Sequence, residues 1–361
     1  MEDAPALLDA ADVLDMAVAA GSIPGAALVT GQGHAGWEPD APISGHFVGR
    51  TATVDGFDVG PDTVFDLASL TKVVATLPSV LYLVDRGEVA LDDPVIRFIP
   101  EFGSGQKSGN DADRDAVTVR QLLSHTSGLP DGHPFYAIEG TPDERWQAVP
   151  TIGLIARPGR TMCYSDIGFM LLGRIVEAVT GMGLDEVATA VIFNPLGMVD
   201  TRFCPPASWI DRCAATEPRP SGEVTIGAVH DENAAALGGI AGHAGLFATG
   251  PDIARYIRSW CDPDTAIVSP ATRLEAFRCQ TTTLAARRGL GWTLRGDRWD
   301  HMGTAWPATG AGHTGFTGTS IAIDPISGIW TVLLTNAVHL GRGSQAIIAL
   351  RRDIHDAVAR S

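Results

Sequence analysis

Lysine is almost absent from this chain. Of its 26 Lys and Arg residues, only Lys72 and Lys107 are lysine, which leaves 24 arginines (26 − 2). Arginine stays protonated in proteins and cannot accept a proton from a hydroxyl group. A lysine amine can accept one when burial or a neighbouring charge lowers its pKa. A lysine kept in such a chain is therefore a candidate functional residue.

Cysteine is scarce as well. The chain has five cysteines, an odd number, and none of them forms a CxxC pair. This pattern favours reduced thiols over a disulfide framework or a zinc site. The ten histidines form no HExxH motif and no comparable cluster. We therefore expect neither a metal ion nor another cofactor.

Positive charge is outnumbered by 42 Asp and Glu residues, which gives a formal net charge of −16. This balance argues against a nucleic-acid partner or an anionic membrane surface. The first five residues lack the charged and apolar regions of a secretory signal, and no apolar run reaches transmembrane length. We therefore expect a cytoplasmic protein; its oligomeric state is left open.

A chain of 361 residues with 45% hydrophobic residues can form a large core and two lobes. Apolar periodicity predicts helices over residues 5–20, 69–87, 117–124, 167–180, 184–192, 252–260 and 344–358. β-rich runs predict strands over residues 26–30, 290–294, 318–323 and 329–335. The strands thus lie towards the two ends of the chain, around a helical insertion.

This arrangement predicts an α+β fold in which an antiparallel β-sheet is flanked by terminal helices and accompanied by an all-helical lobe. We expect residues 1–85 and 235–361 to form the sheet lobe, and residues 86–234 to form the helical lobe.

The first motif is Ser69-Leu70-Thr71-Lys72. Positions i and i+3 share one face of a helix, so the amine of Lys72 can reach the hydroxyl of Ser69. At the first turn of a helix, free N–H groups and the helix dipole favour a developing negative charge. The alternative is an N-capping serine beside a solvated lysine.

The second motif could assist Ser69 and Lys72. Tyr164-Ser165-Asp166 precedes the helix predicted from residue 167, and a phenol held near a lysine ammonium can act as a general base. The alternative is that Asp166 caps this helix and Tyr164 is a half-buried loop residue.

The third motif, His313-Thr314-Gly315, lies just before Phe316, where we expect a strand to begin. A strand edge beside a nucleophile can offer a backbone N–H to an oxyanion. The alternative is an ordinary turn that leads into a strand.

In this order and at this spacing, the three motifs resemble the signature of the serine β-lactamase and penicillin-binding protein superfamily. They suit its class C branch, which includes esterases, D-amino-acid peptidases and acyltransferases. Residues 121–129, 239–247 and 289–292 resemble further stretches of the family. The resemblance implies a β-lactamase/transpeptidase-like fold with the active site at the junction of its two lobes.

The resemblance also implies roles for individual residues. Ser69 matches the nucleophile that becomes acylated, and Lys72 matches the amine that activates it. Tyr164 matches the general base. The N–H groups of Ser69 and Phe316 match the oxyanion hole.

Substrate contacts are implied for Asp166, His313, Thr314 and Gly315. Two of these depart from the usual pattern, because Asp166 stands where Asn is common and His313 where Lys is common. A carboxylate cannot donate a hydrogen bond, and a histidine lacks a permanent charge. Both changes favour an ester or an uncharged amide as the acyl donor over a β-lactam or a peptide.

Several other residues can be interpreted in two ways. Trp292, Trp299 and Trp306 furnish either an apolar acyl pocket or packing in the core. His125 and His243 lie in small-residue turns, which favours a role in stabilising those turns.

The sequence thus predicts a serine acyl-enzyme catalyst that acts on a small molecule, with an esterase-type hydrolase as the favoured reaction. The alternative is a transacylase that moves the acyl group to an amine or alcohol in secondary-metabolite or antibiotic biosynthesis. The bias towards arginine indicates a GC-rich genome, in which such pathways are common. A β-lactamase, a D-amino-acid peptidase and a non-catalytic binding domain are less favoured.

Overall fold

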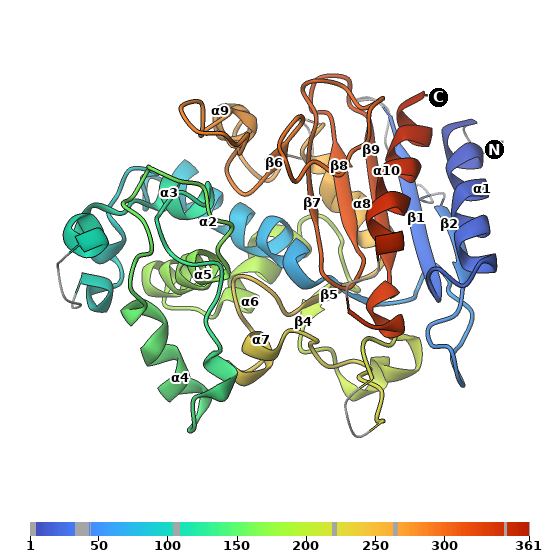
Figure 1. Cartoon of the computed structure of the whole chain (residues 1–361), viewed down its shortest axis with the longest axis horizontal. Helices are drawn as coiled ribbons and strands as arrows, with labels where there is room; N and C mark the ends of the chain where they lie inside the picture. The colour runs from blue at the N-terminus through green and yellow to red at the C-terminus, as the bar shows by residue number, and fades with distance from the viewer. Residues whose placement is uncertain are drawn as a thin grey trace.

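The computed structural model describes residues 5–32, 43, 45–103, 109–218, 222–262, 266–342 and 345–360. Lys107 lies outside these residues. Within them, a six-stranded sheet with the helices of both chain ends forms one side of the molecule, and a group of helices forms the other (Figure 1).

The main sheet is antiparallel throughout and has the strand order β2-β1-β9-β8-β7-β6. Its strands are β1 (Gly25–Gly31), β2 (Gly45–Gly49), β6 (Thr293–Leu294), β7 (Ala311–Thr314), β8 (Ser320–Ile323) and β9 (Trp330–Thr335). The predicted antiparallel sheet, built from the two ends of the chain, is therefore confirmed. The edge strand β2 was not predicted, because its half-buried residues lie in a glycine-rich stretch.

Alternating side chains of β1 pack against both faces of this sheet. Ala26 and Leu28 join the core beneath the terminal helices, whereas Ala27 and Val29 join the larger core on the opposite face. The helices concerned are α1 (Pro5–Ala19) and α10 (Gln345–Arg360) on the first face and α8 (Gly250–Ser259) on the second. The terminal helices α1 and α10 lie side by side against this face of the sheet, which confirms the predicted flanking (Figure 1).

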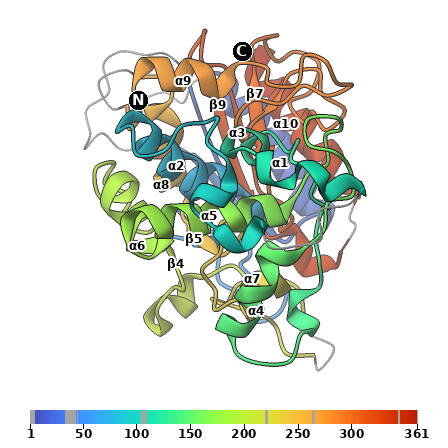
Figure 2. The same cartoon turned by 90° about the vertical axis from the view of Figure 1, so that its left-hand side faces the viewer.

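The other helices are α2 (Leu77–Asp85), α3 (Val119–Leu123), α4 (Pro142–Ala148), α5 (Asp166–Thr180), α6 (Leu184–Ala188), α7 (Glu232–Ala236) and α9 (Pro270–Phe277). Figure 2 shows α5 among them, and Gly181 ends that helix in the left-handed conformation. Helices α4, α7 and α9 were not predicted. The reason is clear for α4, which buries none of its residues and so shows no apolar stripe.

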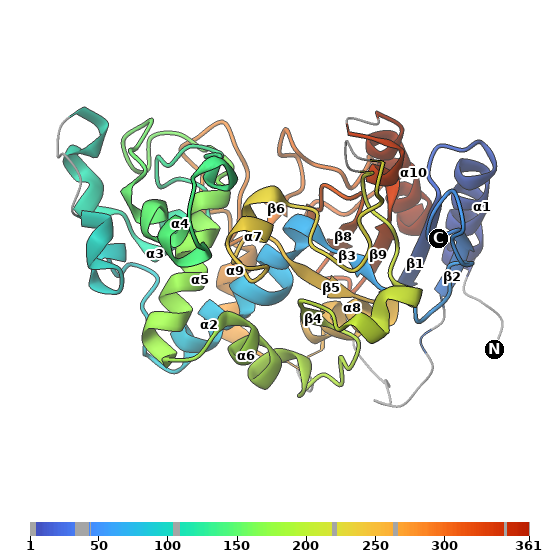
Figure 3. The same ribbon diagram turned by 90° about the horizontal axis from the view of Figure 1, so that it is seen from below.

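A second sheet of three strands lies near the centre of the molecule (Figure 3). Its strands, in the order β3-β5-β4, are β3 (Phe65–Asp66), β5 (Leu246–Ala248) and β4 (Arg202–Phe203). β3 ends three residues before Ser69 and so fixes the approach of the chain to the first motif.

The helix predicted after Ser69 is built from several pieces. A short 3₁₀ turn over Ala68–Leu70 leads into a π-helical turn over Lys72–Thr76, and then into α2. The regular helix thus begins only with α2, and Pro78 sits in its first turn, where proline is tolerated. The segment Ala68–Asp85 has the length and hydropathy of a membrane span, but 78% of it is buried inside the protein.

Candidate active site

Ser69 follows a strained turn. Ala68 has a φ of +47°, which is unusual for a residue with a side chain. Its N–H donates to Oδ1 of Asp66 at 2.8 Å, and the hydroxyl of Thr317 donates to the Asp66 carbonyl at 2.7 Å. Burial raises the pKa of the Asp66 carboxyl to about 6. These bonds hold the turn that presents Ser69, and they tie it to the segment after the third motif.

Lys72 lies directly behind Ser69. Its Nζ donates to the Ser69 hydroxyl at 2.9 Å and pairs with Oδ1 of Asp166 at 2.7 Å. The Lys72 side chain is fully buried, and this burial lowers the pKa of its amine. The Asp166 carboxylate, with a further contribution from Tyr164, outweighs burial and leaves the pKa above its usual value. Lys72 is therefore an ammonium in the resting enzyme, a hydrogen-bond donor rather than a base.

Tyr164 lies against this ammonium, with Nζ of Lys72 4.9 Å from the centre of its ring. Burial raises the pKa of the phenol, the charge of Lys72 lowers it, and the charge of Asp166 raises it again. The result is a pKa above the usual value. Tyr164 is therefore a phenol at neutral pH, and a base role requires that it lose its proton during the reaction.

The third motif lies where a strand ends. His313 and Thr314 are the last residues of β7, and Phe316 lies in the turn that leads to β8. The expectation that a strand begins at Phe316 is therefore wrong. Gly315 is required in this turn, because a Cβ atom there would lie 2.4 Å from the carbonyl oxygen of Leu67.

His313 carries no charge at neutral pH. Its Nδ1–H donates to the carbonyl oxygen of Thr314 at 2.9 Å. Burial, followed by the charges of Lys72 and Arg288, holds the pKa of its imidazole well below the usual range. Position 313, where lysine is common in the family, thus carries no positive charge here, as the sequence indicated.

One cavity of about 320 Å³ brings these groups together. The predicted residues that line it are Ser69, Tyr164, His313, Thr314, Gly315 and Phe316. The rest of the lining is Arg288, Thr293, Trp299, Ala337, Val338, Gly341, Arg342, Gln345, Ile347, Ile348 and Arg351. Of the three tryptophans considered, Trp299 lines the cavity, whereas Trp292 and Trp306 are buried in the protein.

Asp166 has a role that the sequence did not suggest. The cap of α5 is Ser165, whose hydroxyl accepts a hydrogen bond from Gly168 N–H at 3.2 Å. Asp166 is absent from the cavity wall, and its carboxylate is the counter-ion of Lys72. The capping interpretation is therefore wrong, because Ser165 is the cap, whereas the substrate contact of Asp166 stays a prediction.

His125 supports the second motif from behind. Its Nδ1 accepts a hydrogen bond from Ser165 N–H at 3.0 Å, and its ring lies 4.6 Å from the ring of Tyr164. Burial holds the pKa of its imidazole well below the usual range. The expected role in stabilising a turn is confirmed, and the same contact orients Tyr164.

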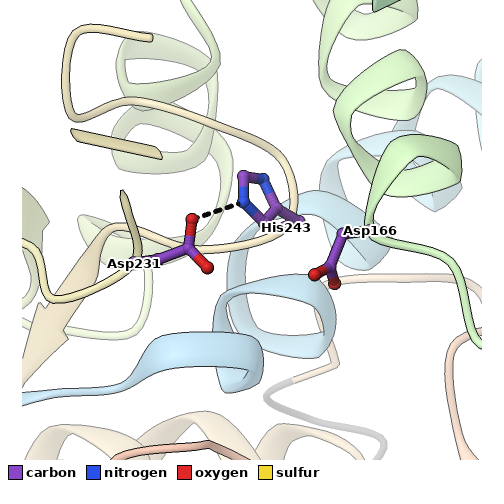
Figure 4. A group of neighbouring side chains, drawn as sticks. All are labelled: Asp166, Asp231 and His243. Carbon is purple, nitrogen blue, oxygen red and sulfur yellow. Dashed lines mark hydrogen bonds and ion pairs between the residues drawn. The ribbon is translucent and has the colours of Figure 1, made fainter. Parts of the chain in front are cut away.

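Asp166 also belongs to a group that could attract a metal ion. Ligand atoms of Asp166, Asp231 and His243 lie within 4.8 Å of one another, and Nε2 of His243 is 2.9 Å from Oδ1 of Asp231 (Figure 4). The Lys72 ammonium, however, pairs with Asp166 and donates to the His243 carbonyl at 3.0 Å. A cation of the protein thus already occupies this negative region, and it would repel a divalent ion.

We therefore expect activity to be unchanged after incubation with a metal chelator. The Lys72 ammonium, which donates to Ser69, already pairs with the Asp166 carboxylate, so no metal ion is needed to balance that charge. The measurement is the ester hydrolysis rate before and after treatment with EDTA and removal of the chelator. A loss of activity that zinc or magnesium restores would contradict this assignment.

Three residues near the site, Asp66, Arg288 and Arg351, were not predicted from the sequence. Arg351 left a weak signal, because it falls one helical turn after Ile347 on the apolar stripe of the last predicted helix. Asp66 and Arg288 left none, since single charged residues in turns and short strands are common.

Comparisons with known proteins show the family to which the chain belongs. A family model described as Beta-lactamase matches residues 10–355. A protein of Escherichia coli K12 named "Putative D-alanyl-D-alanine carboxypeptidase" is 34% identical over 305 residues, which cover 77% of this chain and 70% of that protein. A protein of the same name from Salmonella agona is 31% identical over 314 residues, with the same coverage.

Solved structures share the fold. EstCE1, described as a hydrolase with promiscuous acyltransferase activity, superimposes with a TM-score of 0.77 at 21% identity, over 97% of this chain and 98% of that chain. Simvastatin synthase from Aspergillus terreus gives a TM-score of 0.77 at 21% identity, over 99% and 98%. A β-lactamase/D-alanine carboxypeptidase from Yersinia pestis gives 0.74 at 21% identity, over 97% and 99%. This chain therefore belongs to the Beta-lactamase family, within the serine β-lactamase and penicillin-binding protein superfamily that its motifs resemble.

Proposed function

We propose that this protein is a serine acyl-enzyme hydrolase that cleaves an ester or amide of a small molecule. The observation that carries the proposal is the 2.9 Å hydrogen bond from Lys72 Nζ to the Ser69 hydroxyl, formed beside Tyr164 and open to one cavity. A nucleophile, a fixed positive charge and a titratable phenol are the groups that this reaction needs.

The reaction begins when Tyr164 loses its phenolic proton to solvent, and the Lys72 ammonium stabilises the phenolate that remains. Ser69 Oγ then attacks the carbonyl carbon while this phenolate takes the hydroxyl proton. The C–O or C–N bond to the leaving group breaks, and Tyr164 gives the proton to that group and becomes a phenolate again. The N–H groups of Ser69 and Phe316 are proposed to bind the oxyanion, since both residues line the cavity.

In the second step, an acceptor attacks the acyl group on Ser69 while the Tyr164 phenolate takes the acceptor's proton. The bond between the acyl carbon and Ser69 Oγ then breaks, and Tyr164 returns the proton to Ser69. Water as acceptor gives hydrolysis, and an amine or alcohol gives a new amide or ester. Transacylation is the second candidate, because EstCE1 combines hydrolase and acyltransferase activity on the same fold. A D-alanyl peptide, suggested by the name of the curated relatives, is a third donor to test.

The test uses p-nitrophenyl butyrate, with and without an added primary amine. We expect the wild-type protein to release nitrophenol and Ser69→Ala to show only the background rate. Amide product at the expense of butyrate would establish transacylation, and butyrate alone would establish hydrolysis. Equal rates for the wild type and Ser69→Ala would overturn the proposal.

A further inference from the structure

The two N–H groups proposed to bind the oxyanion come from distant parts of the chain. Ser69 lies in the 3₁₀ turn that follows β3, and Phe316 lies in the turn between β7 and β8. An oxyanion is stabilised only when its donors point at the position that the oxygen will occupy. Neither donor lies in an α-helix or a strand, so contacts between the two turns must set this alignment.

Asp66, the last residue of β3, contacts both turns. Its Oδ1 accepts a hydrogen bond from the N–H of Ala68 at 2.8 Å, directly before Ser69. Its carbonyl oxygen accepts a hydrogen bond from the hydroxyl of Thr317 at 2.7 Å, directly after Phe316. Each of these bonds is therefore one residue away from a proposed oxyanion donor.

The second carboxylate oxygen of Asp66 holds a third segment of the chain. Oδ2 accepts a hydrogen bond from the N–H of His230 at 2.7 Å. The imidazole ring of His230 stacks on the ring of Phe316, with 5.6 Å between the ring centres and 18° between the planes. Asp66 is thus linked to the side chain of Phe316 as well as to the backbone beside it.

The turn before Ser69 depends on such contacts. Ala68 has a φ of +47°, a strained conformation that persists only where the surrounding structure holds it. The carbonyl oxygen of Leu67 accepts a further hydrogen bond from the hydroxyl of Thr319 at 3.2 Å. If the bonds of Asp66 were lost, we expect the turn to relax and the N–H of Ser69 to move.

The carboxylate of Asp66 is costly to keep at this position. Only 2% of the residue is exposed, and among the described residues no cation forms an ion pair with it; two backbone N–H groups bind its oxygens instead. Burial raises the pKa of this carboxyl to about 6, so the group is still ionised at neutral pH. A buried charge without a paired cation lowers stability, and proteins tolerate such costs chiefly where function requires them.

We propose that Asp66 is a positioning residue of the oxyanion hole, which aligns the N–H groups of Ser69 and Phe316 through its carboxylate and its carbonyl oxygen. The inference rests on the proposed function, because it concerns the same reaction. It adds a residue that does not line the cavity. The carboxylate is required because it accepts at both oxygens, whereas an amide has one accepting oxygen and a protonated carboxyl has a hydroxyl in place of the other.

The first test is Asp66→Asn, which keeps the size of the side chain and removes one acceptor. We expect kcat/KM for p-nitrophenyl butyrate to fall about 10- to 100-fold, since misplaced oxyanion donors lose much of their effect. The matched control is Asp252→Asn. Asp252 is buried too, burial raises the pKa of its carboxyl to about 6, and it accepts from Thr201 and Asp200 without lining the cavity. This control should leave kcat/KM unchanged.

A transition-state analogue separates positioning from a loss of stability. The boron of n-butylboronic acid accepts an electron pair from Ser69 Oγ, whose proton passes to solvent, and the adduct is a tetrahedral anion like the reaction intermediate. Its inhibition constant should rise in Asp66→Asn by about the factor by which kcat/KM falls, because both depend on the oxyanion hole. A loss of stability alone would leave this constant unchanged in the molecules that remain folded.

Three titratable groups act on the Asp66 carboxyl, namely His230, Asp231 and Cys213. Burial raises the pKa of Asp231, but pairing with His243 outweighs burial and keeps this carboxyl ionised. Burial raises the pKa of the Cys213 thiol to about 11, so the thiol stays neutral. The other neighbours, Phe247 of β5 and Thr317 of the turn after β7, do not titrate.

The pH profile therefore gives a second readout. Protonation of Asp66 removes one acceptor, so wild-type kcat/KM should fall more steeply below about pH 6 than above it. The fold should not weaken with it, because a pKa raised above that of the unfolded chain makes protonation favour the folded state. Asp66→Asn should lose the steeper fall, whereas His230→Gln, which keeps the backbone N–H that Asp66 binds, should retain it.

Unchanged kcat/KM and inhibition constant in Asp66→Asn, or a steeper fall below pH 6 that this variant retains, would overturn the proposal. If Asp66→Asn does not fold, Thr317→Val replaces it, since it removes the hydrogen bond to the Asp66 carbonyl. Thr317→Val should raise the inhibition constant of n-butylboronic acid, and an unchanged constant would refute the inference.

Failure of the proposed function looks different from failure of this inference. Ester turnover that is equal in the wild type and Asp66→Asn supports the hydrolase and refutes the positioning role. If no ester is turned over, n-butylboronic acid should still raise the Tm of the wild type and of Asp252→Asn more than that of Asp66→Asn. An equal shift in all three proteins, or no shift in any, would refute the inference.

Discussion

Replacement of Lys72 by methionine is expected to lower kcat/KM at least about 10³-fold, since it removes both the hydrogen bond to Ser69 and the charge that stabilises a Tyr164 phenolate. It should also lower the free energy of unfolding by about 2–3 kcal/mol. The reason is that the Asp166 carboxylate, with 29% of its side chain exposed, loses the cation that pairs with it. Because Asp166 is partly exposed, we expect this loss of stability to lie at or below the low end of the values for broken buried ion pairs.

A second variant separates the two effects. Lys72→Met combined with Asp166→Asn removes both charges, so stability should return towards the wild-type value while activity stays lost. Urea denaturation and ester hydrolysis measure the two quantities. If the single variant kept its activity, Lys72 would not belong to the catalytic machinery. If the double variant were less stable than the single one, the ion pair would not explain the loss of stability.

Replacement of Tyr164 by phenylalanine is expected to lower kcat by about 10²- to 10⁴-fold, as for the loss of a general base. Stability should change little, because the ring stays in contact with His125 and Lys72. A matched control is Tyr136→Phe, which removes a hydroxyl from an exposed tyrosine. Equal activity of Tyr164→Phe and the wild type would exclude the phenol as the base.

The pH profile gives an independent check of the same role. The pKa of the phenol is raised, chiefly by burial, so the fraction of phenolate increases with pH into the alkaline range. The pKa of Lys72 is raised as well, so the ammonium is kept over the same range. Wild-type kcat/KM should therefore rise from neutral to alkaline pH, and Tyr164→Phe should lose this rise. A plateau that begins below pH 7 in the wild type would contradict the account.

The residues of the candidate site were easier to predict from the sequence than the charges that surround them. The spacing of Ser69 and Lys72 predicted their contact, because it depends on one turn of the local backbone. The partner of Lys72 could not be read in this way, since Asp166 reaches it only through the packing of α5 against the segment after Ser69. That contact decides the charge of Lys72, and a local motif does not encode it.

The fold, too, could be predicted where the sequence carries a local signal and not elsewhere. β1, β8 and β9 were predicted from runs of β-rich residues, and α5 from its apolar periodicity. The third motif was placed before a strand rather than at the end of β7, because four residues that include glycine and histidine give little strand signal. Arg351 is buried at a position where periodicity expects an apolar residue, and only the structure shows that it lines the cavity.

Acylation of Ser69 is tested most directly by mass spectrometry of the intact protein after brief incubation with p-nitrophenyl butyrate, followed by peptide mapping. We expect one added butyryl group, located on Ser69 and absent from Ser69→Ala. An acyl group on another residue, or turnover that persists unchanged in Ser69→Ala, would contradict it.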